Sequence, residues 1–552
     1  MKDTKITTNN LKPTTINHLL VVSGGIMKVL VSDKLSEKGI EILKEAGDID
    51  VDVKTGLTKE QLVTEIPKYH GLIVRSSTKV TADIINAAAN LKVIGRAGIG
   101  VDNVDVDAAS KKGIIVMNTP EGNVITTAEH AIAMMLSLAR KIPQANASMK
   151  GKKWEKGFMG VEVYNKTLGI IGLGRIGGIV AHRAKGLSMN VIVYDPFISK
   201  ERASTMGVEL VELHELFRRS DFISLHVPKT SETTNLIGER EFALMKKGVR
   251  IINCARGGIV DEKALYKAIK EKIVAGAALD VFEKEPVPPD NPLLELDELI
   301  CTPHLGASTD EAQVNVAIDI AEQIVDFFKK GQIRNAVNVP SVSADLLSKI
   351  QPYLTLGERL GSIHAQLVEG GVRKIMVKYS GDIVNLGVKP ITISVIKGFL
   401  QVFIGEGINM VNAPFIAKER GIEVVETTTS ESYDFASLIS VTIKTEKMEK
   451  LIEGTIFGKK DPRIVRIDEY WVEASPSGNM LIFSNIDAPG VIGKIGTILG
   501  DAAINIAGMQ LGRNKPRGNA LSIVNVDSAI PDQTLAKIRS LPDIIYAKMV
   551  RL

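Results

Sequence analysis

The feature that most restricts this sequence is a glycine-rich turn, Gly172-Leu173-Gly174-Arg175-Ile176-Gly177, that joins an apolar run to a helical pattern. The run Leu168–Ile171 predicts a strand, and the pattern Ile176–Leu187 predicts a helix. The first glycine permits a tight turn, the second lets the backbone approach a pyrophosphate, and the third allows close packing of helix on strand. Because the first N–H groups of a helix favour an anion, this segment predicts a dinucleotide site in an α/β sheet.

Asp195 follows the next apolar run, Val191–Tyr194, and stands 18 residues after Gly177. A carboxylate at this place accepts hydrogen bonds from the adenosine ribose hydroxyls and repels a 2′-phosphate, so NAD is predicted rather than NADP. A structural glycine turn beside an unrelated surface aspartate is the alternative. That alternative is disfavoured because the strand, the glycines, the helix and the acidic residue follow one another at the spacing of the dinucleotide-binding fingerprint.

Apolar runs and helical patterns alternate along residues 27–118 and again along residues 168–281. This alternation predicts an α/β fold with parallel sheets covered by helices, the second of them doubly wound. Residues 124–149 and 310–330 show long helical patterns, and each predicts one helix.

The pattern changes after a linker at Asn335–Pro340. Residues 341–473 mix helical patterns with strands such as Lys374–Tyr379 and hold no catalytic constellation. From residue 479 to residue 552 the order strand, helix, strand, strand, helix, strand predicts a ferredoxin-like sheet.

Charge and composition exclude several classes of protein. The 552 residues carry 68 basic and 64 acidic side chains without a Lys/Arg block, which argues against nucleic acid as a partner. No run of about 18 apolar residues is present, so a membrane span is excluded. The two cysteines, Cys254 and Cys301, suit a reducing compartment, and a cytoplasmic protein is expected. Residues 1–26 precede a second methionine, Met27, and are expected to be a disordered extension or an upstream-start artefact.

Four side chains with useful chemistry follow apolar runs of the second block: Arg256, Asp280, Glu285 and His304. Ligands of open α/β sheets bind beyond the carboxyl ends of the strands. Oxidising an alcohol beside a carboxylate needs a cation for the carboxylate, a base for the hydroxyl proton and a stabiliser for the protonated base. Arginine, histidine and glutamate meet these needs, so Arg256, His304 and Glu285 are the candidate catalytic residues. No metal site is expected.

His304 and the neighbouring candidate Cys254 each have an alternative interpretation. His304 alone is equally consistent with a structural loop histidine, and only its company with Arg256 and Glu285 favours catalysis. Cys254 lacks a paired base, so it is interpreted as a small apolar residue lining the cofactor pocket rather than as a nucleophile.

Six segments resemble the D-isomer-specific 2-hydroxyacid dehydrogenases: GLGRIG (172–177), NCARGGIVDE (253–262), ALDVFEKEP (278–286), CTPHLGAST (301–309), RSSTKVTADIINAA (75–88) and GRAGIGVDNVD (95–105). Together they are most similar to the branch of that family that oxidises 3-phosphoglycerate. The resemblance covers about residues 27–340. It implies NAD-dependent hydride transfer from 3-phospho-D-glycerate to give 3-phosphohydroxypyruvate, the first step of L-serine biosynthesis.

The resemblance also implies a domain plan. Residues 27–123 and 309–336 would form a discontinuous, flavodoxin-like substrate domain. The Rossmann-type NAD-binding domain, residues 124–308, would be inserted into it. An α/β intervening domain over 341–473 and an ACT-like domain over 479–552 would follow.

Individual residues take roles from the same resemblance. His304 matches the acid/base, Glu285 its partner, and Arg256 the arginine that binds the substrate carboxylate and carbonyl. Asp280 would approach the nicotinamide carboxamide. Expected cofactor contacts are Gly172, Gly174, Arg175, Ile176, Gly177, Asp195, Cys254, Asp280, Gly306 and Ala307. Expected substrate contacts are Arg75, Gly98, Ile99 and Gly100, with a solvated turn arginine as the alternative for Arg75.

The C-terminal segments bear on substrate and regulation, because residues 479–552 resemble an ACT domain, a regulatory module of amino-acid metabolism. Asn505 matches an asparagine of serine-binding members, whereas Asn485 and Asp487 depart from the residues of some of them. Serine as an effector and a purely oligomerising role both stay open. The long helices and this module suggest a homo-oligomer, and the resemblance implies a tetramer.

Two rival functions stay open at this point. One is another 2-hydroxyacid or 2-ketoacid reductase, acting on hydroxypyruvate or glyoxylate. The other is an NADH-sensing binding protein, which the complete set of Arg256, Glu285 and His304 disfavours.

Overall fold

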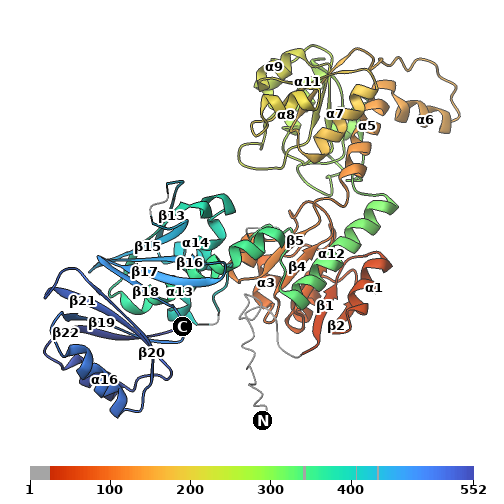
Figure 1. Ribbon diagram of the computed structural model, residues 1–552. Helices are drawn as coiled ribbons and strands as arrows, with labels where there is room; N and C mark the ends of the chain where they lie inside the picture. Colours follow the sequence, from red (N-terminus) through yellow and green to blue (C-terminus); the bar gives the residue numbers. More distant parts are fainter. Residues whose placement is uncertain (1–24, 340–343, 406, 432–433) are drawn as a thin grey trace, which may run out of the picture. The chain divides into compact units, whose positions relative to one another are not determined.

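The computed structural model describes residues 25–552 except 340–343, 406 and 432–433 (Figure 1). The described residues form two units. The seven-stranded unit contains Leu35–Gly39 and Thr119–Asp319, and the three-sheet unit contains residues 25–34 with Ile40–Asn118 and the described part of Ile320–Leu552. The prediction for residues 1–26 lies outside the described residues, apart from Gly25 and Ile26.

The seven-stranded unit is a doubly wound parallel sheet of order β12-β11-β10-β9-β6-β7-β8, which confirms the predicted fold class. The chain starts at central β6, winds outward through β7 and β8, and returns to β9 on the other side, so the strand order reverses beside β6. Its strands are β6 (Thr167–Ile171), β7 (Asn190–Tyr194), β8 (Glu209–Leu210), β9 (Phe222–Leu225), β10 (Val249–Asn253), β11 (Val274–Leu279) and β12 (Leu299–Cys301). Its helices between strands are α7 (Arg175–Gly186), α8 (Lys200–Thr205), α9 (Leu213–Arg219), α10 (Glu239–Phe242) and α11 (Glu262–Lys270).

The prediction of one helix over residues 124–149 is wrong. Helix α5 (Val124–Arg140) ends at Lys141, whose φ is 52°, and α6 (Ile142–Lys150) begins directly after it. Pro143 lacks the N–H that a continuous helix requires and is favoured in the first turn of a new one. Helix α6 contributes no buried residue, and in Figure 1 it lies apart from the other labelled helices of its unit.

The first sheet of the three-sheet unit is parallel, with the order β2-β1-β3-β4-β5 of a flavodoxin-like fold. Residues of α12 (Asp310–Lys330) from Ile320 onward pack on it, and Gln323 Nε2 donates to Asn118 O at 3.1 Å. The strands are β1 (Met27–Val31), β2 (Ile49–Val53), β3 (Gly71–Val74), β4 (Val93–Arg96) and β5 (Ile115–Asn118), and the helices are α1 (Glu37–Glu45), α2 (Lys59–Glu65), α3 (Ala82–Ala87) and α4 (Val106–Lys111).

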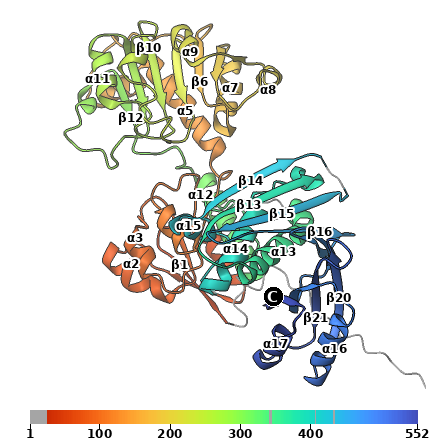
Figure 2. The same ribbon diagram turned by 90° about the vertical axis from the view of Figure 1, so that its left-hand side faces the viewer.

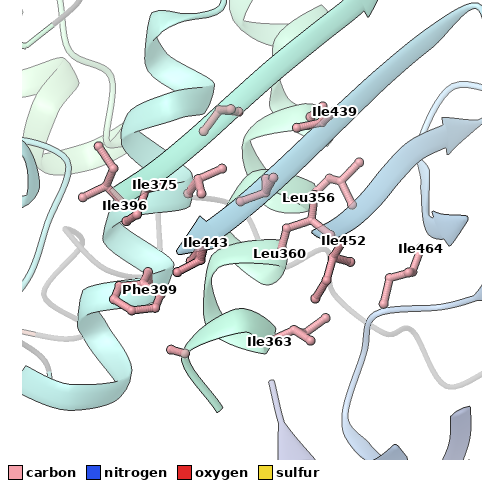
Figure 3. Packing of buried hydrophobic residues seen from close by; sticks show 14 of the residues in the cluster. Leu356, Leu360, Ile363, Ile375, Ile396, Phe399, Ile439, Ile443, Ile452 and Ile464 are labelled. Atoms are coloured by element: carbon pink, nitrogen blue, oxygen red, sulfur yellow. The ribbon is translucent and has the colours of Figure 1, made fainter. Parts of the chain in front are cut away.

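The second sheet has the order β14-β13-β15-β16-β17-β18, and helices cover one of its faces (Figure 2). Figure 3 shows Leu360 and Ile363 of α13 and Phe399 of α14 lying toward Ile443 and Ile452 of the strands. The opposite face carries polar side chains, so most of its strands lack the apolar runs by which sequence analysis recognises strands. The elements are α13 (Ala344–Leu367), β13 (Val372–Gly381), α14 (Lys389–Ile404), α15 (Ala413–Glu419), β14 (Glu423–Thr429), β15 (Ser437–Thr445), β16 (Glu449–Phe457), β17 (Asp461–Ile467) and β18 (Tyr470–Ala474).

The third sheet is antiparallel, has the order β20-β21-β19-β22, and confirms the predicted ferredoxin-like fold. Met480, Ile482, Leu521 and Ile523 from this sheet join the core of the second sheet. Its elements are β19 (Asn479–Ile486), α16 (Val491–Asp501), β20 (Ile506–Arg513), β21 (Asn519–Val526), α17 (Asp532–Arg539) and β22 (Ile544–Arg551). Among the described residues, no helix has the length and apolar character needed to cross a membrane.

Candidate active site

The imidazole of His304 and the carboxylate of Glu285 are in direct contact. His304 Nδ1 lies 2.7 Å from Glu285 Oε2, and the N–H of Phe282 donates to Glu285 Oε1 at 3.1 Å. The side chains are 47% and 39% exposed, so both can meet a ligand. Because the carboxylate engages Nδ1, the ring atom left for proton exchange with a ligand is Nε2.

This contact shifts both pKa values toward the charged pair. The hydrogen bond with Glu285 raises the pKa of His304 above its ordinary value, against the opposing effects of burial and of the positive charge of Arg256. Burial alone would raise the pKa of Glu285, but hydrogen bonds from His304 and the Phe282 N–H outweigh it and leave that pKa lowered. The pair therefore stabilises an imidazolium, the form that a histidine base takes after accepting a proton.

Arg256 lies in a turn just beyond β10 that is held by two hydrogen bonds of the Asn253 side chain. Asn253 Nδ2 donates to Arg256 O at 2.9 Å, and Ala255 N–H donates to Asn253 Oδ1 at 3.0 Å. A Cβ added at Gly257 would lie 1.8 Å from Phe282 O, so only glycine lets this turn approach the segment that leads to Glu285. The close approach explains why the charge of Arg256 acts on His304.

Asp280, at the end of β11, is buried and fixes the loop that carries His304. Its carboxylate accepts from Thr302 Oγ1 at 2.5 Å and from the N–H groups of Leu305 and Gly306 at 2.6 and 2.9 Å, and its backbone oxygen accepts from His304 N–H at 2.9 Å. Burial raises its pKa, but these bonds and the one from His130 outweigh burial, so the pKa is lowered and Asp280 stays ionised.

His130 of α5 is a participant that sequence analysis missed. Its Nε2 lies 3.2 Å from Asp280 Oδ1 and 3.1 Å from Thr302 Oγ1. The sequence offers no signal for this role, because residue 130 lies 150 positions before Asp280 inside an ordinary helical pattern.

The glycine turn has the geometry that a pyrophosphate requires. Gly172 has a φ of 94°, and a Cβ added at Gly177 would lie 2.0 Å from Gly172 O. Around Gly174, where α7 begins, nothing lies within 4 Å of an added Cβ, so the helix N-terminus faces open space. A phosphate can approach the backbone there. Arg175, on the same turn, pairs through Nη2 with Glu121 Oε1 at 2.9 Å.

Asp195 lies against this turn. Its Oδ2 accepts from Leu173 N–H at 2.7 Å, and its Oδ1 accepts from Phe197 N–H at 2.9 Å. A carboxylate has about four acceptor sites, so these bonds leave capacity for ribose hydroxyls. Cys254 is buried, and burial raises the pKa of its thiol, which disfavours a nucleophilic role.

The remaining cofactor candidates lie at the start of α7 and in the loop after His304. Ile176 is half-buried at the start of α7. Gly306 O accepts from Thr127 Oγ1 at 2.9 Å, and Ala307 O accepts from Gln313 Nε2 at 2.9 Å, so the loop after His304 is anchored to α5 and α12. The turn, Asp195 and this loop together fit NAD.

The predicted substrate contacts belong to the three-sheet unit. Arg75 follows β3, its N–H donates to Asp33 Oδ2 at 2.6 Å, and burial lowers its pKa. Arg96, which sequence analysis missed, ends the neighbouring strand β4 and is the register partner of Val74. Its guanidinium lies over Gly98, where an added Cβ would fall 1.6 Å from Nη1. The sequence did hold a signal for Arg96, because this residue ends a strand and lies within the segment of residues 95–105 that resembles the family.

The backbone of the Gly98–Gly100 loop is held by one contact from β5. Asn118 Nδ2 donates to Ile99 O at 2.5 Å. Gly98 has a φ of 143°, a conformation that glycine adopts most readily.

The three candidate effector residues have separate partners in the ferredoxin-like sheet. Asn485 is buried and donates through Nδ2 to Ile486 O at 2.8 Å. Asp487 Oδ2 accepts from Arg513 Nη1 at 3.3 Å. Asn505 Nδ2 donates to Asp527 Oδ2 at 2.7 Å.

Three family models match the sequence. The NAD-binding domain of D-isomer-specific 2-hydroxyacid dehydrogenases matches residues 132–306, the D-3-phosphoglycerate dehydrogenase intervening domain matches residues 349–468, and the ACT domain matches residues 479–543.

Two relatives match along nearly the whole chain. The chain is 49% identical to a D-3-phosphoglycerate dehydrogenase of Archaeoglobus fulgidus over 95% of its own length and 100% of the relative. It is 48% identical to a D-3-phosphoglycerate dehydrogenase of Methanocaldococcus jannaschii over 96% of its own length and 100% of the relative. A D-lactate dehydrogenase of Aquifex aeolicus, solved with NAD and lactic acid, is 31% identical, has a TM-score of 0.50, and covers 57% of this chain and 100% of its own.

Proposed function

The chain belongs to the D-3-phosphoglycerate dehydrogenase family of the D-isomer-specific 2-hydroxyacid dehydrogenases, and from this membership we propose which of its side chains carry out the reaction. The reaction is the NAD-dependent oxidation of 3-phospho-D-glycerate to 3-phosphohydroxypyruvate, the first step of L-serine biosynthesis. The observation that carries the proposal is the contact of His304 with Glu285 within range of the Arg256 charge.

His304 acts as the base in this proposal. Its Nε2 accepts the proton of the substrate 2-hydroxyl while Glu285, on Nδ1, stabilises the resulting imidazolium. NAD, when bound, accepts the hydride that leaves carbon 2. Arg256 binds the carboxylate and the oxygen that becomes the carbonyl, because a guanidinium stays charged and can donate two parallel hydrogen bonds.

The cofactor residues hold NAD in this proposal. The backbone at Gly172–Gly177 binds the pyrophosphate, and Asp195 binds the ribose hydroxyls. Asp280 acts at the nicotinamide end of NAD by fixing the loop that carries His304. Cys254, Gly306 and Ala307 line the NAD site, and Arg175 and Ile176 contact NAD at the start of α7.

We further propose that Arg75 and Arg96 bind the substrate phosphate. Their strands are neighbours in one parallel sheet, and both side chains start from its carboxyl end, where ligands bind. The backbone N–H groups of Gly98, Ile99 and Gly100 supply further donors. Consistent with this plan, residues 27–123 and 309–336 are proposed as the substrate domain and residues 124–308 as the NAD-binding domain.

The ACT domain points to an amino-acid effector, and we propose L-serine as that effector, bound near Asn485, Asp487 and Asn505. An exposed apolar arm supports a homo-oligomer, proposed as a tetramer. It comprises Ile142, Met149, Trp154, Met159 and Tyr164, each at least 52% exposed on or just after α6. Both cysteines are free thiols, which suits a cytoplasmic location.

One assay tests the proposed function. Purified chain is mixed with NAD and 3-phosphoglycerate, and NADH formation is followed with and without L-serine, beside parallel reactions with D-lactate and D-glycerate. The expected result is turnover of 3-phosphoglycerate that exceeds the turnover of the unphosphorylated acids at least a hundredfold. Equal rates for D-glycerate would contradict the phosphate role of the arginines. Unchanged rates with L-serine would contradict the effector role.

A further inference from the structure

The helix-free face of the six-stranded sheet contains a cavity that the reaction does not use. Its volume is about 510 Å³, within the range of small-molecule sites. The lining includes two cationic and two anionic side chains, which suits a ligand that carries both signs. The lining residues are Met376, Lys378, Ser380, Asp434, Phe435, Leu438, Ser440, Thr442, Leu451, Glu453, Arg466 and Trp471.

Five of these residues form one continuous row across the sheet, which we call the charged row. Lys378 is paired with Ser440, Ser440 with Glu453, Glu453 with Arg466, and Arg466 with Trp471, each on the next strand. Neighbouring strands lie about 4.8 Å apart. The row therefore presents a cation, a hydroxyl, an anion and a second cation at steps of about 4.8 Å, ending in an aromatic ring.

The anion and the second cation are fixed in advance. Glu453 is buried, with its side chain 11% exposed, and Ser440 Oγ donates to its Oε1 at 2.5 Å. Arg466 Nε donates to Asp468 O at 2.6 Å, and its guanidinium lies over the Trp471 ring, 5.4 Å from the centroid. Arg466 Nη1 and Glu453 Oε2 form an ion pair at 3.6 Å, which is longer than a hydrogen bond, so each group keeps hydrogen-bonding capacity for a ligand.

Lys378 is the other cation of the row. It is exposed, lines the cavity, and within the part of the chain that the structure describes it forms no ion pair. Lys374, four residues earlier on the same face of β13, differs in that it pairs with Glu423 at 3.0 Å.

We propose that the charged row binds an α-amino acid with an anionic side chain. The α-carboxylate meets Arg466 and the ammonium meets Glu453, one strand away, which matches the short separation of these groups in an α-amino acid. The anionic end of the side chain meets Lys378, two strands further along the row. Met376 and Leu451, register partners of Thr442 in the adjacent row, cover the methylene carbons.

Titration calorimetry on the full-length chain tests this site. L-glutamate and O-phospho-L-serine are the probes, and together they distinguish a carboxylate from a phosphate at the Lys378 end. Glutarate lacks the ammonium and L-leucine lacks the side-chain anion. The expected result is one site per chain for at least one probe, with at least tenfold weaker binding of glutarate and of L-leucine. No binding of either probe, or equal binding of glutarate, would overturn the proposal.

Variants locate the binding. Glu453→Gln and Lys378→Met should each lower the affinity for the probe at least tenfold. Lys374→Met, the matched control on the same strand face, should bind the probe as the unaltered chain does. Asn505→Ala should also retain binding, which separates this site from the ACT domain. Because Lys378 is exposed, its substitution remains informative even where Glu453→Gln fails to fold. Undiminished binding in Lys378→Met would overturn the proposal.

Discussion

His304 Nδ1 and Glu285 Oε2 lie 2.7 Å apart although the two residues come from separate loops, one after β11 and one after β12. Because β11 and β12 are adjacent parallel strands, their carboxyl ends carry both loops to the same edge of the sheet. Asp280 then anchors the second loop through four contacts, which leaves the His304 ring little freedom to leave its partner.

Removal of the base should abolish most turnover. His304→Ala is expected to lower kcat for 3-phosphoglycerate oxidation by about 10² to 10⁴, the usual contribution of positioned proton transfer. NADH binding, measured by fluorescence titration, should change less than threefold, because the glycine turn that binds the cofactor follows β6, whereas His304 follows β12. Near-normal kcat would refute the assigned role.

The pH profile should move when the carboxylate partner is neutralised. Glu285 raises the pKa of His304, and oxidation requires the neutral imidazole, so the acid limb of kcat/KM lies above the ordinary histidine value. In Glu285→Gln this limb should shift to lower pH, while the maximal rate falls. For the reverse reduction, which requires the imidazolium, the alkaline limb should shift in the same direction. An unmoved limb would show that Glu285 does not set the pKa of His304.

Cofactor choice should depend on Asp195. Asp195→Ala is expected to raise the ratio of NADP to NAD efficiency at least tenfold, since the charge that repels a 2′-phosphate is lost. Affinity for NAD should also fall, because Asp195 accepts the Leu173 N–H of the glycine turn. Steady-state kinetics with both cofactors measure the ratio, and an unchanged ratio would count against the ribose contact.

His130 should matter for both stability and turnover. His130→Ala removes a partner of the buried Asp280 carboxylate, and hydrogen bonds to charged groups contribute about 1.5 to 3 kcal/mol. The free energy of unfolding, from urea denaturation, should fall by about that amount, and kcat should fall with it. His130→Gln, which keeps a donor, should recover part of both losses. His182→Ala on the exposed side of α7 is the control and should change neither.

The apolar arm should carry subunit contacts. Trp154 is 76% exposed and Met159 is 83% exposed, and large exposed apolar surfaces mark interfaces. The double variant Trp154→Ala, Met159→Ala is expected to lower the mass observed by light scattering to that of a smaller assembly. Trp471→Ala, at the other exposed tryptophan, should leave the mass unchanged. An unchanged mass in the double variant would place the interface elsewhere.

The sequence by itself determined the features that depend on local geometry. The glycines of residues 172–177 follow a strand and open a helix, so the dinucleotide fold, the preference for NAD and the family were readable from neighbouring residues. The alternation of runs and helices gave the doubly wound and ferredoxin-like sheets, which the structure confirms. The end of α5 at Lys141 was missed because the apolar periodicity continues through Pro143, although proline restarts the helix there.

Only the tertiary structure decided which distant residues meet. Residues far apart in the chain are joined by the contact of Asp280 with His130, by the pairing of Arg96 with the strand that precedes Arg75, and by the charged row from Lys378 to Arg466. The sequence around each of these residues does not identify its partner, because the partners lie on elements far apart in the chain and meet only when whole sheets bury their apolar faces. The chemistry of each side chain was therefore fixed by the sequence, and its partners were fixed by the fold.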